Sequence, residues 1–146
     1  MNEFEITVVI ERPVEDVFAV LTDLSKTPAW TPGLTEVRRD GGGPLQMGQV
    51  MTFVGSFLGR DYESAAAVTE LVANERFASK TTSGPFQLEV DSRLEPVANG
   101  TRLATVYRGE SHGFFRIAEP IATRLARKQF ETAAVNLKAL MEEKAL

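Results

Sequence analysis

The sequence predicts an α+β fold in which an antiparallel sheet of about seven strands packs against a long C-terminal helix. Two short helical segments are expected after the first strand. Three patterns predict this arrangement: apolar and polar residues alternate near the N-terminus, strand-like segments joined by short turns fill the middle, and apolar residues recur with a helical period near the C-terminus.

The N-terminal segment has the pattern of a half-buried strand. Phe4, Ile6, Val8 and Ile10 are separated mostly by polar or charged residues. Pro13 ends this strand and suits the first turn of a helix, and residues 14–21 then carry apolar side chains at helical spacing. Residues 25–32 form a proline-broken stretch around Trp30 that predicts one helical turn and a loop.

Strand-like segments follow, separated by short turns rich in glycine, proline and asparagine. Such short connections predict an antiparallel meander. The turn at residues 56–59 places Phe57 and Leu58 at a hairpin tip, where the pair is either exposed or folded back onto the sheet. The predicted strands are residues 35–39, 48–54, 58–71, 76–82, 86–94 and 101–110.

The last third of the chain, residues 114–144, predicts the long helix. From residue 120 to residue 144 it would be about 37 Å long at about 1.5 Å per residue. A helix of that length needs a large apolar surface to pack on. Its predicted buried face consists of Phe114, Ala118, Ile121, Leu125, Ala126, Phe130, Ala133, Leu137 and Leu140 or Met141.

Length and composition predict a single domain over residues 1–146, located in the cytoplasm. The net charge of -4 argues against a protein that mainly binds nucleic acid. Cysteine is absent and His112 is the single histidine, so we expect no disulfide, no metal site and no cofactor. The N-terminal residues do not resemble a signal peptide, and no apolar run is long enough to cross a bilayer.

Alternation within the strands predicts which side chains face the helix. This inner set is apolar and aromatic with several hydroxyls and, apart from Arg60 near a strand end, almost no charge, whereas Gln87 and Glu110 are expected to face water. Two interpretations stay open: a cavity for a neutral lipophilic ligand, or a packed core whose hydroxyls bond to the backbone. The inner set is Tyr62, Ser64, Ala66, Val68, Phe77, Ser79, Thr81, Phe86, Leu88, Val90, Ser92, Leu94, Leu103, Thr105, Tyr107 and Ser111.

This order of elements resembles the START-like (SRPBCC) superfamily and, within it, the polyketide cyclase/dehydrase-type proteins. The resemblance covers essentially the whole chain. It implies a helix-grip fold, in which a curved sheet wraps around the C-terminal helix and encloses a ligand cavity. Its members bind lipids, isoprenoids, polyketides or plant hormones, and some cyclise or dehydrate polyketides. The matching segments are IERPVEDVF (10–18), LTD (21–23), PAW (28–30), VTEL (68–71), GTRL (100–103) and LKALME (137–142).

The resemblance favours the cavity, so the expected function is binding of a hydrophobic small molecule that is lipid-, isoprenoid- or polyketide-like. Trp30 lies on the short helix that helps to close the cavity in relatives. The candidate ligand-binding residues are Trp30, Phe53, Tyr62, Ser64, Ala66, Phe77, Ser79, Leu88, Val90, Thr105, Tyr107 and Leu125.

Two other functions stay open. A polyketide cyclase or dehydratase would use Tyr62, Tyr107 and His112 to position and protonate a substrate carbonyl, although a lone histidine at a strand end is more often a loop residue. A membrane- or protein-interaction module would use the tip at Phe57 and Leu58 with the mildly basic final helix. The sequence does not favour membrane contact, and it does not predict an oligomeric state.

Overall fold

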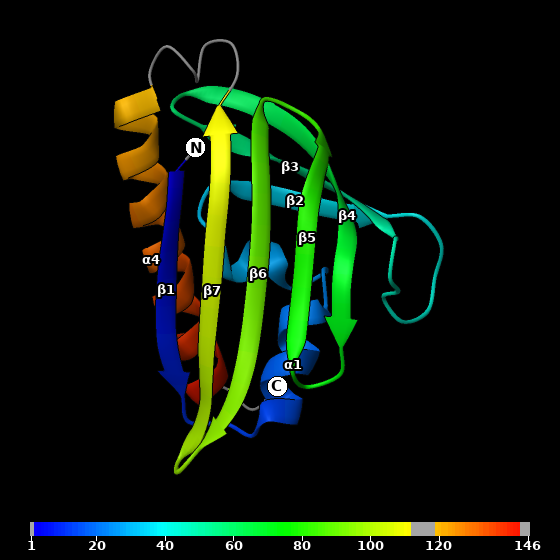
Figure 1. Cartoon of the computed structure of the whole chain (residues 1–146), viewed down its shortest axis with the longest axis vertical. Coiled ribbons are helices and arrows are strands. Elements are labelled where there is room, and N and C mark those ends of the chain that lie inside the picture. The colour runs from blue at the N-terminus through cyan, green and yellow to red at the C-terminus, as the bar shows by residue number, and fades with distance from the viewer. Residues whose placement is uncertain (1, 112–118, 144–146) are drawn as a thin grey trace.

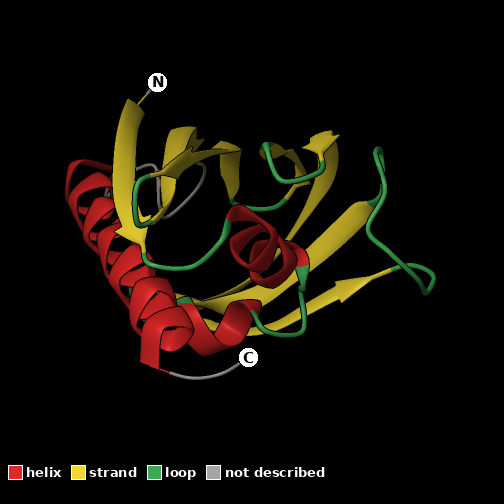
Figure 2. Ribbon diagram, turned by 90° about the horizontal axis from the view of Figure 1, so that it is seen from below, coloured by secondary structure: helices red, strands yellow, loops and turns green. Residues whose placement is uncertain are grey.

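The computed structural model describes residues 2–111 and 119–143. In this part of the chain a seven-stranded antiparallel sheet with the order β1-β7-β6-β5-β4-β3-β2 curls around three helices (Figures 1 and 2). The predicted α+β helix-grip fold is therefore confirmed. The helices are α1 (Val14–Thr22), α2 (Thr27–Trp30) and α4 (Glu119–Glu143). The strands are β1 (Asn2–Ile10), β2 (Leu34–Arg39), β3 (Val50–Phe57), β4 (Arg60–Val72), β5 (Arg76–Ser83), β6 (Phe86–Val97) and β7 (Gly100–Ser111).

The sheet is a meander with one long-range pairing. Strands β2 to β6 each pair with the next strand in sequence, whereas β1 pairs with β7, so that Ile6 lies opposite Thr105. Register shifts occur within β4, between Ala65 and Ala66 and between Val68 and Glu70. Irregularities of this kind bend a strand and increase its twist, which helps the sheet to curve around the helices.

The turn between β3 and β4 is shorter than the sequence predicts. Phe57 pairs with Arg60, so the loop contains only Leu58 and Gly59, with φ angles of 53° and 74°. Two positive φ values are typical of the tight turn whose twist matches that of paired strands. Phe57 is buried and contacts Tyr62 and Phe86, so it folds back onto the sheet.

The main core lies at the end of the molecule where β1 enters α1. Leu137 and Met141 from α4 are 1% and 0% exposed, and they pack with Ile10, Val17 and Leu103. Polar contacts hold the same end of α4: Arg12 Nη1 donates to the carbonyl of Met141 at 2.8 Å, and the backbone N–H of Glu11 donates to Glu142 at 2.8 Å. A cationic side chain on a last-turn carbonyl stabilises a helix C-terminus.

The prediction for the buried face of α4 is wrong at Ile121 and Leu125, which are 60% and 38% exposed. Successive helical residues are rotated by about 100°, so Leu125 lies about a quarter turn away from the row formed by Ala126, Ala133 and Leu137. Both side chains therefore miss the sheet. No helix among the described residues is long and apolar enough to cross a membrane.

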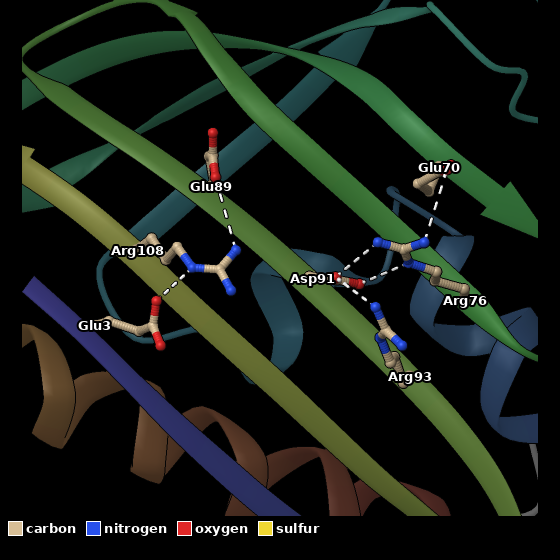
Figure 3. A network of polar contacts seen from close by, with 7 residues as sticks. All are labelled: Glu3, Glu70, Arg76, Glu89, Asp91, Arg93 and Arg108. Carbon is tan, nitrogen blue, oxygen red and sulfur yellow. Dashed lines mark hydrogen bonds and ion pairs between the residues drawn. The ribbon is translucent and has the colours of Figure 1, made fainter.

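The face of the sheet that points away from α4 carries a network of ion pairs (Figure 3). Arg76 donates to both oxygens of Asp91, at 3.0 Å and 2.9 Å, and approaches Glu70 at 3.7 Å. The hydrogen bonds from Arg76 lower the pKa of Asp91. Arg108 bonds to Glu3 across the pairing of β1 with β7, which ties the edge strand to its neighbour.

Replacing Asp91 with asparagine should destabilise the protein at neutral pH by about 1 kcal/mol. Arg76 then loses a carboxylate that accepts two of its hydrogen bonds, and solvent already screens part of the attraction between the two charges. A lowered pKa means that this stabilisation is present above the ordinary carboxyl pKa and lost as pH falls through the native value. Urea unfolding from pH 7 down to pH 3 should therefore show the two proteins converging in acid.

Glu89→Gln is the matched control. Glu89 is 43% exposed and its contacts with Lys80 and Arg108 are 3.5 Å and 3.9 Å long. This change should cost less than about 0.5 kcal/mol. A gap between Asp91→Asn and wild type that stays constant with pH would contradict the proposed role of the Asp91 charge.

Candidate ligand cavity

A cavity of about 320 Å³ lies between the inner face of the sheet, helix α2 and the part of α4 between Thr123 and Leu137. All seven strands contribute side chains to it, β2 only through Leu34, and α4 contributes mainly small residues. Ala126, Ala133 and Ala134 face the cavity from α4, and they are too short to fill the space down to the sheet. The volume is at the lower end of the range of about 300–1,000 Å³ that small-molecule sites occupy.

One wall of the cavity is a stack of three aromatic rings from three elements. Phe130 of α4 stacks on Tyr107 of β7 with ring centroids 4.0 Å apart, and Tyr107 stacks on Phe4 of β1 at 5.3 Å. Arg127 lies 5.6 Å from the centre of the Phe4 ring. The stack joins α4 to the two strands at this edge of the sheet and closes the cavity on that side.

A second aromatic cluster lines the cavity near the hairpin of β3 and β4. The ring of Phe86 meets Phe57 edge-on at 5.6 Å and Tyr62 at 5.7 Å. A side chain on Gly55 would come within 2.9 Å of the Tyr62 hydroxyl and 2.4 Å of the Gly33 carbonyl oxygen. Glycine is therefore required at this position for β2, β3 and Tyr62 to approach one another.

Most hydroxyl groups on the sheet side of the cavity already have hydrogen-bond partners. Ser92 and Thr105 bond to each other at 2.9 Å. Thr81 donates to the carbonyl of Leu88 and accepts its N–H, both at 3.1 Å, and Ser64 donates to the carbonyl of Ser83. These hydroxyls form their hydrogen bonds within the protein, as the packed-core interpretation expects.

Helix α2 differs from the sheet in this respect. Thr27 Oγ1, Trp30 Nε1 and Thr31 Oγ1 are buried, and none has a hydrogen-bond partner among the described residues. All three residues line the cavity. Buried polar groups in proteins are usually paired, so a cluster of three such groups on α2 and its C-cap residue requires an explanation.

The ionisable groups in the lining are few. Burial raises the pKa of both Tyr107 and Tyr62, so each stays a neutral phenol at physiological pH. A neutral phenol donates a hydrogen bond but does not act as a base. Among the described residues that line the cavity, Glu110 is the one charged side chain.

The structure gathers nearly all the predicted ligand-binding residues around this cavity. Leu125 is the exception, because its side chain points away from the sheet and does not line the space. His112 lies outside the described residues. The predicted residues in the lining are Trp30, Phe53, Tyr62, Ser64, Ala66, Phe77, Ser79, Leu88, Val90, Thr105 and Tyr107.

Several lining residues were not predicted. Gln87 and Glu110 are exposed, as expected, but they lie opposite each other near the start of β6 and the end of β7, where both also border the cavity. Strand alternation does not reveal this, because the cavity reaches the strand ends. Thr27 and Thr31 lie three and one residues from Trp30, and this helical spacing was a signal that sequence reasoning missed.

Replacing Tyr107 with phenylalanine should make the protein less sensitive to alkali. A raised native pKa means that the stabilisation from the neutral phenol is fully present below the ordinary tyrosine pKa of about 10 and is lost as pH rises through the native value. Above pH ~10 the free energy of unfolding of the wild type should fall more steeply than that of the variant, by up to about 1.4 kcal/mol per pH unit. Urea unfolding between pH 8 and pH 11 measures both slopes, and equal slopes would show that Tyr107 ionises freely.

Comparison with known proteins supports the fold and identifies the family. A protein from Thermus thermophilus has a TM-score of 0.80 and 16% identity, with 94% of each chain covered. A START superfamily protein from Mycobacterium smegmatis has a TM-score of 0.79 and 18% identity, with 97% of each chain covered. The di-domain aromatase/cyclase StfQ of the steffimycin biosynthetic pathway has a TM-score of 0.74 and 13% identity, over 97% of this chain and 50% of that one.

At these identities the structural likeness shows the fold alone, and no curated protein sequence matches the chain. The family model described as "Polyketide cyclase / dehydrase and lipid transport" matches residues 1–142. Since that match covers nearly all of the 146 residues, the chain belongs to the polyketide cyclase/dehydrase and lipid transport family.

Proposed function

We propose that this protein binds a hydrophobic small molecule, lipid-, isoprenoid- or polyketide-like, in the cavity between the sheet and α4. The observation that carries this proposal is the cavity itself, about 320 Å³ in volume and lined mainly by aliphatic and aromatic side chains. The family and the START-like fold suggest the same general role. Sites with this lining bind ligands chiefly by shape and by removing apolar surface from water.

The energetics of a largely apolar cavity also favour a ligand. Cavities made in protein cores cost about 24 cal/mol for each Å³ left unfilled. A molecule that fills the space recovers part of that cost and stabilises the folded state in proportion to its concentration. The small residues Ala66, Ser79 and Ala134 in the lining keep the space open, where larger side chains would close it.

An enzymatic function, cyclisation or dehydration of a polyketide, is the second candidate. The two buried phenols, Tyr62 and Tyr107, support it because each can donate a hydrogen bond to a carbonyl inside the cavity. A raised pKa makes both poor bases, so a proton acceptor would have to come from elsewhere, such as Glu110 or His112. Turnover of an aromatic poly-β-ketone by wild type but not by Tyr107→Phe would favour the enzyme, and tight binding without turnover would favour the carrier.

Filling the cavity should abolish binding. We expect Ala66→Trp to weaken the affinity for the neutral fluorescent probe N-phenyl-1-naphthylamine by at least about tenfold, because the indole would occupy the space that the probe needs. Ala67→Trp is the control, since Ala67 is the next residue of β4 and does not line the cavity. Probe fluorescence titrations measure both affinities, and circular dichroism checks the fold.

Ala134→Phe fills the same cavity from α4, so this variant replaces Ala66→Trp in the binding test if Ala66→Trp does not fold. A folded variant of either kind that binds the probe as tightly as wild type would refute the assignment of this cavity as the binding site. Native mass spectrometry of the purified protein, followed by organic extraction, would then identify any natural ligand by mass.

A further inference from the structure

The polar groups around the cavity differ in whether they have hydrogen-bond partners. Most threonine and serine hydroxyls on the sheet are paired with one another or with the backbone, as at Ser92, Thr105 and Thr81. The polar atoms of α2 are not, since Thr27 Oγ1, Trp30 Nε1 and Thr31 Oγ1 have no partner among the described residues. These three atoms have almost no accessible surface, so an atom in the cavity reaches them only after the side chains turn towards it.

We propose that Thr27, Trp30 and Thr31 form a polar subsite that binds a neutral oxygen atom of the ligand, such as a ketone, ester carbonyl or hydroxyl oxygen. This inference rests on the proposed ligand-binding function and specifies its chemistry. The α2 subsite, as we name these three residues, would anchor one polar end of an otherwise apolar molecule.

Thr27 and Trp30 are positions i and i+3 of α2, which share a face, and Thr31 follows directly as the extended residue that caps the helix. All three residues line the cavity. The backbone N–H of Thr31 donates to the carbonyl of Thr27 at 3.1 Å, so the helical turn is closed. Asn136 of α4 donates to the carbonyl of Trp30 at 3.3 Å, which ties α2 to the helix on the other side of the cavity.

The donor chemistry of the subsite selects an acceptor. The indole N–H is a donor only, and each threonine hydroxyl can donate one hydrogen bond. A carbonyl oxygen has two lone pairs and can accept from two of these groups at once. Thr27 is 9% exposed, and threonine has more than one accessible χ1 rotamer in a helix, so a change of rotamer can turn its hydroxyl towards the cavity.

The charge of the lining argues for a neutral ligand. No lysine or arginine is found among the described lining residues, and Glu110 adds negative charge. A carboxylate at the α2 subsite would therefore be buried without a cationic partner, which is strongly unfavourable. The subsite fits an uncharged oxygen-bearing lipophile better than a fatty acid anion.

A pair of probes that differ in one atom tests the inference. 2-Acetylnaphthalene and 2-isopropenylnaphthalene share their shape, and the second carries a methylene group in place of the carbonyl oxygen. Thr27→Val, Thr31→Val and Trp30→Phe should each weaken binding of the ketone by about three- to tenfold, because one hydrogen bond to it is lost. Binding of the hydrocarbon should change by less than about twofold, since it makes no such bond.

Thr81→Val is the matched control, because the Thr81 hydroxyl lines the same cavity but is already bonded to Leu88. It should lower the melting temperature and leave the ratio of the two affinities unchanged. Thr27→Val and Thr31→Val should leave the melting temperature of the unliganded protein unchanged or raise it, because no hydrogen bond is lost. A lower melting temperature in both would show that these hydroxyls already have partners, and it would overturn the proposal.

The other outcomes separate the subsite from the cavity. Binding of both probes with an affinity ratio that none of the three α2 variants changes would refute the α2 subsite and leave the proposed function intact. Binding of neither probe would refute the proposed function and the subsite with it. Tight binding of 2-naphthoate, the matching anion, would refute the preference for a neutral oxygen.

Discussion

Dense packing at one end of the molecule determines where the cavity lies. Leu137 and Met141 are completely enclosed by Ile10, Val17 and neighbouring residues, and Arg12 holds the last turn of α4 through the Met141 carbonyl. With its C-terminal end fixed there, α4 crosses the concave face of the sheet. Its next residues on the same face are mostly alanines, and Phe130 reaches the sheet only at the edge, where it stacks on Tyr107. A closely packed end and a sparsely filled part of one helix thus leave an apolar space between that helix and the sheet.

The polar groups around that space divide by the element that carries them. On the sheet, strand pairing places hydroxyls beside one another and beside free backbone groups, so pairs such as Ser92 with Thr105 satisfy themselves. On α2 the backbone bonds are internal to the helical turn, and the side chains of Thr27, Trp30 and Thr31 have no such neighbours. Burial then favours a ligand that supplies the missing partner. The apolar lining would provide most of the affinity for the ligand, and the polar atoms of Thr27, Trp30 and Thr31 would determine where its oxygen atom binds.

The sequence predicted the sheet, its meander and most of the cavity wall, because alternation within a strand assigns each side chain to a face. Predictions from the sequence were less reliable on helix α4, where the period is that of a helix, and at the strand ends, where a residue that faces outward can still border the cavity. Leu125 lies beside Ala126 on the same apolar stretch, and only the angle at which α4 meets the sheet decides between them. Glu110 follows the outward parity of β7 and is exposed, as expected, and it also borders the cavity where the strand ends. Unsatisfied atoms on α2 depend on neighbours distant in sequence, and those neighbours become known only in three dimensions.

The pairing of β1 with β7 also has a consequence for how the chain folds. Residues opposite each other in this ladder, such as Ile6 and Thr105, are about a hundred positions apart, so the ladder closes a long loop at a high cost in chain entropy. During synthesis the strands from β2 to β6 can pair in turn as they emerge, because each is adjacent in sequence to its partner. The N-terminal strand must wait until the last strand is made. Until then its apolar row, Phe4, Ile6, Val8 and Ile10, has no sheet to join, and an unpaired apolar strand of this kind is prone to pair with other chains.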